Sequence, residues 1–183
     1  ADFAATWDSG EGAYRVGGRW NGKGRRIIYC ALDPSTAILE VAVHKGFKTL
    51  DTVPHVLTAL QIRDPALIHV VGRADVPNPN WLVPGIPSAG QQAFGDQLLA
   101  DHLFVAIPSA VSTYSWNLLF DAQRATAGYQ LVSQEPFALE RGAPTFLILV
   151  AAVMPTVEFN DDPRPSAVAS YHLSEKAGYR TIE

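Results

Sequence analysis

The chain is poor in the residues that hold metals or cross-link small secreted domains. It contains one cysteine, Cys30, in 183 residues, so it forms no internal disulfide and no cysteine-ligated zinc site. Its five histidines show no metal-ligand spacing, and no metal is expected. A chain without disulfides is typical of a reducing compartment, which indicates a cytoplasmic protein.

Long apolar runs are also absent. The longest is FLILVAAVM at 146–154, much shorter than the about 20 residues with which a helix spans a bilayer. The opening residues ADFAATWDSG have neither the basic region nor the apolar region of a signal peptide. We therefore expect no membrane partner.

Positive charge is scarce. Fourteen Lys and Arg stand against eighteen Asp and Glu, for a formal net charge of -4. The basic residues form one small cluster, Lys23, Arg25 and Arg26, and no basic stripe. A nucleic-acid partner is therefore not expected, because such a partner requires a concentrated basic surface.

The apolar content, in contrast, is 48%, which is enough for one core in a chain of this length. Strand and helix patterns alternate along the chain and predict a single α/β (α+β) domain with a mixed sheet. Short strands are expected at 13–16, 26–31, 67–74, 103–111, 117–120 and 129–139.

Two helices are expected. The better marked has the sequence DPSTAILEVAVHKG: Asp33 suits the N-cap, Pro34 the first helical position and Gly46 the C-terminal cap. The second, at 88–102, has helical spacing of its apolar residues.

The domain is expected to end near residue 145. Four prolines between 77 and 87 predict irregular surface chain within it. Beyond it, 146–183 is interpreted as a C-terminal extension of uncertain origin, with a linker-like stretch at 160–166.

Glu40 is a carboxylate in an apolar setting. Its helix has apolar residues on almost every side, which is typical of a buried helix. A buried carboxylate either binds a proton or finds a cation or hydrogen-bond donors. The alternative is an exposed pair with His44, which lies four residues further on.

Arg19 lies among four glycines in GGRWNGKG. Its planar fork of donors matches phosphate oxygens, and the glycines would let a ligand approach the backbone. A hairpin turn with a solvated arginine is the alternative, because Asn21-Gly22 is a common turn signal. Neither a Walker A loop nor a dinucleotide fingerprint is present.

Tyr29 lies in the strand that leads into the Glu40 helix. Its ring is suited to stacking on a planar ligand or to filling core, and core is the default. Cys30, beside it, is expected to pack as a small apolar residue.

These residues form a spaced set: GGRW, a tyrosine ten residues after its arginine, and a glutamate in AILEV eleven residues further on. The set resembles the RES-domain family, and most of all the ParT-like toxins of Xre–RES toxin–antitoxin pairs. AFGDQLLADH, AIPSAV and NLLFD resemble later blocks of the family in the same order. The resemblance covers roughly residues 14–120. It departs at Asp121-Ala122, where the family has an Asn-Pro pair.

The resemblance implies a compact fold like that of an ADP-ribosyltransferase, with NAD+ as substrate and no metal. It places catalytic roles on Glu40, Arg19, Tyr29 and Ser109. It places contacts to NAD+ on Arg19, Tyr29, Ser88, Ser109 and Asn117.

The implied chemistry explains a charged helix and a cationic loop. Cleavage of the nicotinamide bond passes through an oxocarbenium-like state, whose positive charge the carboxylate of Glu40 would stabilise. Arg19 would bind the pyrophosphate or a ribose hydroxyl, Tyr29 would stack on nicotinamide, and Ser109 would orient the ribose.

The resemblance also implies partners. A cognate Xre-type antitoxin is expected to cover the active-site cleft in a toxin–antitoxin hetero-oligomer. The first hypothesis for the reaction is mono-ADP-ribosylation of a host protein, phosphoribosyl pyrophosphate synthetase in the ParT-like case, with a bacteriostatic effect. The second is transfer of ADP-ribose to water or phosphate, which depletes NAD+.

Two other classes stay open from the residues alone. A toxin that acts on RNA is disfavoured by the acidic balance and by the lack of an evident His–His or His–Lys pair. A non-catalytic nucleotide-binding module would use Arg19 and Glu40 as an internal salt bridge.

Overall fold

The computed structural model describes residues 5–112, 114–138 and 169–175. Within these ranges the strands form one sheet in the order β3-β4-β5-β1-β7-β2-β6. β3 pairs parallel with β4, whereas the other neighbouring strands pair antiparallel. The strands are β1 (Ile27–Ala31), β2 (His55–Ile62), β3 (Ile68–Val70), β4 (Phe104–Pro108), β5 (Trp116–Asp121), β6 (Tyr129–Phe137) and β7 (Ala169–Glu175).

The helices of the described part of the chain are short. They are α1 (Glu11–Val16), α2 (Pro34–Lys45), α3 (Phe47–Thr52) and α4 (Ala89–Asp101), with the 3₁₀ turns η1 (Pro65–Leu67), η2 (Arg73–Asp75) and η3 (Pro79–Leu82). Within this part, no helix has both the length and the apolar character needed to cross a membrane.

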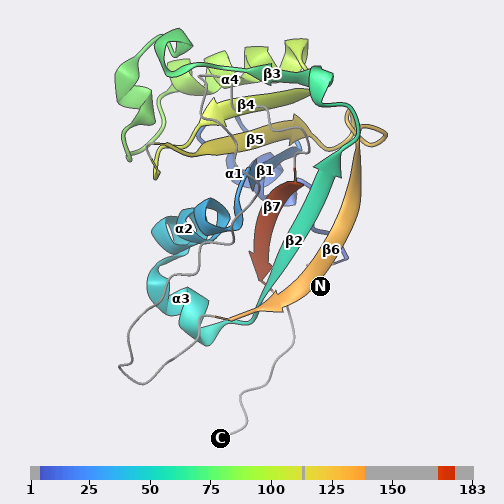
Figure 1. Ribbon diagram of the computed structural model, residues 1–183. Coiled ribbons are helices and arrows are strands. Elements are labelled where there is room, and N and C mark those ends of the chain that lie inside the picture. The colour runs from blue at the N-terminus through green and yellow to red at the C-terminus, as the bar shows by residue number, and fades with distance from the viewer. Residues whose placement is uncertain (1–4, 113, 139–168, 176–183) are drawn as a thin grey trace, which may run out of the picture.

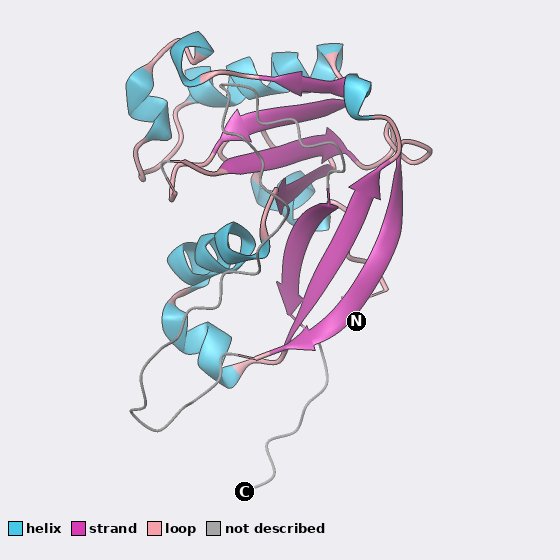
Figure 2. Ribbon diagram, viewed as in Figure 1, coloured by secondary structure: helices cyan, strands magenta, loops and turns pink. Residues whose placement is uncertain are grey.

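The sheet is strongly bent. β3, β4 and β5 run across the direction of β7, β2 and β6, and β1 lies at the bend (Figure 1). α4 lies along the β3–β4–β5 half, whereas α2 and α3 lie beside the other half (Figure 2). The bend thus brings α2 to the edge where β4 ends and β5 begins.

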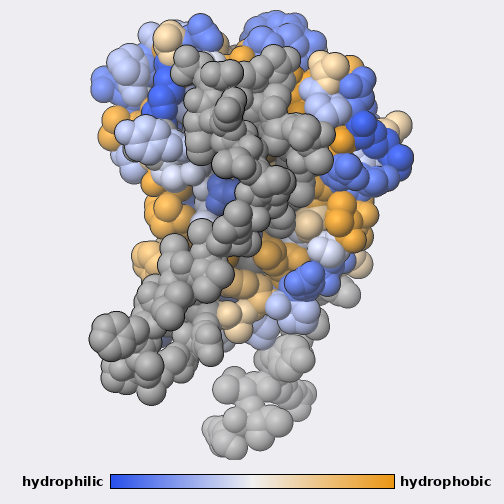
Figure 3. All heavy atoms as spheres, in the orientation of Figure 1, coloured by the Kyte–Doolittle hydropathy of each residue, from blue (hydrophilic) through white to orange (hydrophobic). Residues whose placement is uncertain are grey.

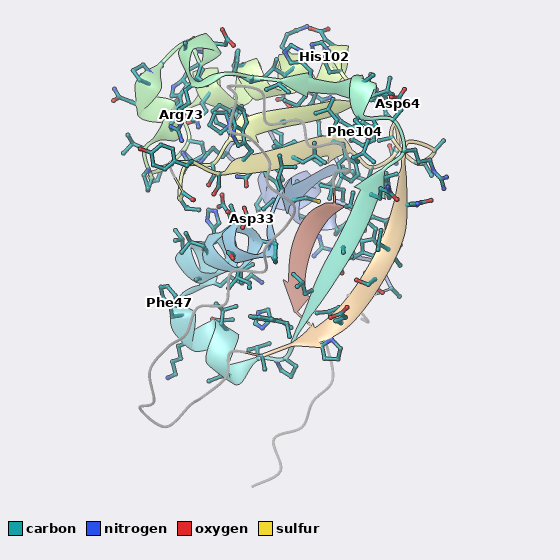
Figure 4. The ribbon with its side chains drawn as sticks, viewed as in Figure 1. Asp33, Phe47, Asp64, Arg73, His102 and Phe104 are labelled. Carbon is teal, nitrogen blue, oxygen red and sulfur yellow. The ribbon has the colours of Figure 1, made fainter. Side chains whose placement is uncertain are left out.

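Each face of the bent sheet has its own core. The α4 core lies between the sheet and α4 and contains Trp20, Ile27, Val71, Val76, Leu99, Val105, Ile107 and Leu119. The inner core fills the concave side and contains Ile28, Cys30, Leu60, Ile62, Ile68, Phe104, Ala106, Leu118, Phe120, Ala125 and Tyr129. Phe104, labelled in Figure 4, is fully buried there. The expectation that Cys30 packs as an apolar residue is confirmed.

Exposed apolar side chains are scattered. On the face that Figure 3 shows, apolar groups lie in several separate places among polar ones. The five most exposed large apolar residues belong to different parts of the described chain: Val16 to α1, Phe47 to α3, Ile86 to the segment before α4, Tyr114 to the segment before β5 and Val132 to β6. Single exposed residues of this kind are normal on a protein surface.

The predicted caps of α2 are confirmed. Asp33 lies where the chain enters the helix (Figure 4), and its Oδ1 accepts the Thr36 N–H at 2.8 Å. Pro34 is the first helical residue, and Gly46 ends the helix with a φ of 85°. A left-handed φ of this kind favours glycine, so the helix ends where the sequence predicts.

The strand predicted at 13–16 is wrong, because this segment is part of α1. Glu11 Oε1 accepts from Arg15 Nε at 2.7 Å, a contact that only a helical turn brings together at this spacing. Tyr14 and Val16 are 44% and 70% exposed, so no apolar strand face is present for a sheet to bury.

Two strands were not predicted. The first is β2, which lies with the helix α3 at 47–62, where the sequence predicted no element. β7 lies within the segment interpreted as an extension, yet it pairs with both β1 and β2. The predicted boundary near residue 145 lies outside the described residues and stays a prediction.

The close packing of α4 on the chain before β1 leads to a stability prediction. A Cβ on Gly95 would lie 2.1 Å from the Trp20 carbonyl oxygen, and backbone cannot move aside cheaply. We expect Gly95→Ala to lower the free energy of unfolding by about 1–3 kcal/mol or more. Urea unfolding measures this change. Gly12→Ala, in α1 with open space around its Cβ, is the control and should stabilise slightly. Equal effects of the two changes would contradict the contact.

Candidate functional site

Glu40 is the centre of a polar cluster where α2 meets β4 and β5. Its Oε1 accepts hydrogen bonds from Ser109 Oγ at 3.0 Å and from Asn117 Nδ2 at 2.7 Å. Its Oε2 lies 3.4 Å from His44 Nε2, and the Glu40 side chain is 22% exposed. Both interpretations of Glu40 therefore hold in part: the carboxylate is largely buried, and it contacts His44.

The apolar pattern of α2 predicted a helix buried on all sides, but the structure differs. Ala37 and Ala42 are buried, whereas Val43 is 49% exposed. One side of α2 thus packs on the protein, and the other faces solvent. Glu40 lies between these sides, which leaves part of its carboxylate accessible.

Opposing effects act on the pKa of Glu40. Burial raises this pKa, but hydrogen bonds from His44, Asn117 and Ser109 together outweigh burial and hold the pKa below its ordinary value. The carboxylate is therefore charged at neutral pH. A charged group held by preorganised donors in a partly dry site is the arrangement that stabilises positive charge nearby.

Ser109 has no hydrogen-bonding capacity left. It is 1% exposed, and its Oγ accepts the N–H groups of Val111 and Ser112, each at 3.1 Å. Its hydroxyl proton goes to Glu40. A hydroxyl with one donor and two acceptor positions is then fully used, so Ser109 holds the carboxylate and the turn after β4 together.

Asn117 has one polar atom without a partner. Its amide nitrogen must face Glu40, because the amide oxygen would be repelled by the carboxylate. The amide Oδ1 is then directed elsewhere, buried and without a hydrogen-bond partner. A buried unpaired acceptor is uncommon and costs free energy, typically about 1–3 kcal/mol.

Tyr29 is held from both sides of its hydroxyl. The hydroxyl donates to Asn21 Oδ1 at 2.7 Å and accepts the Trp20 N–H at 3.0 Å, while the ring packs on the α4 core. Burial raises the pKa of this hydroxyl well above its ordinary value. A Cβ on Gly18 would lie 2.4 Å from the hydroxyl oxygen, so this glycine makes room for Tyr29.

Arg19 reaches the segment before α4. Its Nη1 donates to the carbonyls of Trp81 at 3.1 Å and Val83 at 3.2 Å, and its Nη2 to that of Gly85 at 3.3 Å. The turn in the alternative interpretation is present, because Gly18 and Asn21 pair across Arg19 and Trp20, but the arginine is not simply solvated. Nε–H and one N–H of Nη2 have no acceptor among the described residues, so two donors on adjacent nitrogens remain for an anion.

Arg19 and Glu40 do not form an ion pair, because each has the other partners given above. The form of a non-catalytic module that depends on such a salt bridge is therefore contradicted. Ser88 is not part of either cluster. It caps α4 by accepting the Gln91 N–H at 3.2 Å, and it lines a pocket of about 380 Å³ with Arg19.

The register of β1 and β5 relates the two clusters. Tyr29 pairs with Leu119 and Ala31 with Asn117, so all four side chains lie on the face of the sheet that bears the α4 core. Tyr29 and Asn117 are diagonal neighbours, with Cα atoms about 7–8 Å apart. Tyr29, which holds the loop of Arg19, and Asn117, which holds Glu40, thus lie on one face of the sheet, although Glu40 does not line the Arg19 pocket.

Some of these contacts were not predicted from the sequence. Asn21, Trp81 and Gln91 all contribute to the Arg19–Tyr29 side of the site. Asn21 was noted only as part of a turn signal, and no local motif marks Trp81 or Gln91. Within the described ranges, no group of three or more His, Cys, Asp or Glu residues is placed to hold a metal ion.

Comparison with known proteins identifies the family. Residues 1–140 match the RES domain model. Toxin Res of Pseudomonas putida is 33% identical over 132 residues, which cover 70% of this chain and 87% of that protein. Toxin Res of Yersinia enterocolitica is 31% identical over 138 residues, which cover 74% of this chain and 88% of that protein. Toxin Res of Photorhabdus laumondii is 31% identical over 115 residues, with coverages of 62% and 71%.

The chain therefore belongs to the RES-domain toxin family. The resemblance noted from Arg19, Tyr29 and Glu40 is confirmed, and so is the α+β fold of the ADP-ribosyltransferase type with one mixed sheet.

The charge on Glu40 leads to a prediction on pH. A folded-state pKa below the ordinary 4.5 contributes stability above that pH, and this contribution is lost as the pH falls through the folded-state pKa. We expect the free energy of unfolding of the wild type, relative to Glu40→Gln, to decline below about pH 4.5. Urea unfolding of both proteins at a series of pH values measures this difference, in which the other titrating groups cancel. A difference that stays constant would contradict a carboxylate held in its charged form.

Proposed function

We propose that this chain is a toxin of a type II toxin–antitoxin system that cleaves NAD+ at the bond between nicotinamide and ribose. Family membership supports the toxin role. The observation that carries the chemistry is the charged carboxylate of Glu40, held by Ser109 and by Asn117, whose side chain lies on the same sheet face as Tyr29.

Glu40 would act on the transition state. As the bond to nicotinamide breaks, positive charge develops on the ribose, and a fixed carboxylate lowers the energy of that state most strongly where water is scarce. Both strong donors of the cluster bind Oε1, whereas Oε2 has one longer contact, to His44. Oε2 is thus the oxygen available to the substrate.

Arg19 and Tyr29 would bind and order the substrate. The two remaining donors of Arg19 suit the pyrophosphate. Tyr29 uses its hydroxyl to hold the backbone next to Arg19, so only its ring is left to border nicotinamide. Ser109, whose hydroxyl is fully used, would position Glu40 and would not itself bind the ribose.

The acceptor of ADP-ribose decides the biological effect. Our first proposal is mono-ADP-ribosylation of a host protein, with phosphoribosyl pyrophosphate synthetase as the candidate that the ParT-like resemblance suggests. The second is transfer to water or phosphate, which depletes NAD+. In either case a free enzyme would poison its own cytoplasm, so we propose a cognate Xre-type antitoxin that covers the site in a hetero-oligomer.

One experiment tests the activity and separates the acceptors. The purified chain is incubated with NAD+ labelled in its adenylate part, with and without cell extract. Label on a protein band indicates transfer to protein, whereas free nicotinamide with soluble labelled ADP-ribose indicates hydrolysis or phosphorolysis. Intact NAD+ under both conditions would refute the proposal.

Glu40→Gln tests the role of the carboxylate. The amide keeps the size and the acceptor oxygen but loses the charge, so turnover of NAD+ should fall on the order of 10²-fold or more. Affinity for NAD+ should change much less, because the positive charge of the ground state lies mainly on nicotinamide. Initial rates and calorimetric titration measure the two effects.

Glu135→Gln is the control, since Glu135 is an exposed carboxylate on β6, and it should keep full turnover. Full turnover in Glu40→Gln would remove Glu40 from the mechanism. A melting temperature that falls together with the activity would instead make Glu40 a structural partner.

Arg19→Lys tests the fork. Lysine keeps the charge but offers neither the bidentate geometry nor the reach to three carbonyls. We expect affinity for NAD+ to fall about tenfold or more, because a charge-assisted hydrogen bond contributes about 1.5–3 kcal/mol. Arg15→Lys, at an exposed arginine of α1, should bind NAD+ normally. Equal affinities of the two variants would show that the fork is not needed.

A further inference from the structure

The pocket beside Arg19 is separate from the Glu40 cluster. It has a volume of about 380 Å³ and is formed by the segment 78–88 together with the start of α4. This volume is near the lower end of the about 300–1,000 Å³ that is typical of ligand sites. It suits one nucleotide-sized group and is small for a whole dinucleotide.

Gln91 gives this pocket a fixed acceptor. The residue is 2% exposed, and its Nε2 donates to the Trp81 carbonyl at 3.0 Å. That bond fixes the orientation of the amide, because the reversed amide would place two acceptors together. Oε1 therefore faces away from Trp81, has no hydrogen-bond partner in the described residues, and belongs to a residue that lines the pocket.

The other walls select a planar, anionic ligand. Among the described residues of the lining, Arg19 alone is charged, and its Nε–H and one Nη2–H are left for an anion. The lining also includes Trp81 and the apolar side chains of Val83 and Ile86, against which a base can pack. These walls therefore match a ligand with three groups: an anion for Arg19, a flat ring for the apolar side chains, and a hydrogen-bond donor for Gln91.

We infer that this pocket is a nucleotide subsite that takes the adenylate part of the substrate. In it Arg19 binds the phosphate, and Gln91 Oε1 accepts a hydrogen bond from the exocyclic amino group of the base. The identification of the nucleotide as the adenylate half of NAD+ rests on the proposed function. The requirement for an amino-bearing base rests on the fixed amide of Gln91 alone.

The test compares AMP with IMP, which carries an oxo group where AMP carries the amino group. Calorimetric titration of the full chain should show AMP binding about tenfold more tightly than IMP, since one net hydrogen bond is worth about 1 kcal/mol and two facing acceptors repel. In Gln91→Met, which keeps the length of the side chain and removes its amide, the two nucleotides should bind equally. Gln97→Met, at an exposed residue of the same helix, is the matched control and should keep the ratio.

The ratio is insensitive to a general loss of folded protein, because both nucleotides are measured on the same sample. Equal binding of AMP and IMP to the wild type, an unchanged ratio in Gln91→Met, or no AMP binding would each overturn the inference. The outcome is also independent of catalysis. A preference for AMP in a protein that leaves NAD+ intact would support the subsite while refuting the proposed function, and NAD+ turnover without that preference would do the reverse.

Discussion

The site depends on two hydrogen bonds to one oxygen of Glu40, which come from Ser109 and Asn117. Glu40 lies on α2, Ser109 follows β4, and Asn117 is the second residue of β5. The bond from Ser109 spans 69 residues and that from Asn117 spans 77. Only the bend of the sheet brings α2 to this edge, so the charge on Glu40 and the path of the chain depend on the same contact. Without these donors, burial would favour a protonated carboxylic acid.

The glycine-rich loop before β1 serves the fold first. Gly18 makes room for the Tyr29 hydroxyl, which in turn holds the Trp20 N–H. Trp20 is buried in the α4 core, and Arg19, next to it, is directed outward to the carbonyls of Trp81, Val83 and Gly85. One tyrosine thus anchors the loop, and this anchor gives the guanidinium a fixed position at the rim of a pocket.

The sequence predicts what is local and misses what depends on distant pairing. The ends of α2 follow from Asp33, Pro34 and Gly46, because these residues act on their own backbone. The segment at 13–16 was misassigned as a strand since its helical contact comes from Glu11, outside the apolar pattern. β2 has buried residues at almost every position, and a short apolar segment of this kind does not show its partners in the sheet.

The site could be predicted as a set of residues but not as a set of contacts. The spacing of Arg19, Tyr29 and Glu40 and the family resemblance identify these residues and Asn117, and the structure places Tyr29 and Asn117 on one face of the sheet. They do not show that Ser109 has no free hydroxyl proton, or that Asn117 Oδ1 is unpaired. Gln91 carries no sequence signal, since its role depends on a carbonyl in another segment.

The position of β7 has a consequence for synthesis of the chain. β7 is translated after the other six described strands, yet it lies between β1 and β2. Until it emerges from the ribosome, the sheet consists of two unconnected parts, each with an unpaired edge that is open to other chains. Contacts between strands so distant in sequence also form slowly. The complete sheet therefore forms only late in translation, and this interval gives a binding partner access before any activity that requires the complete sheet.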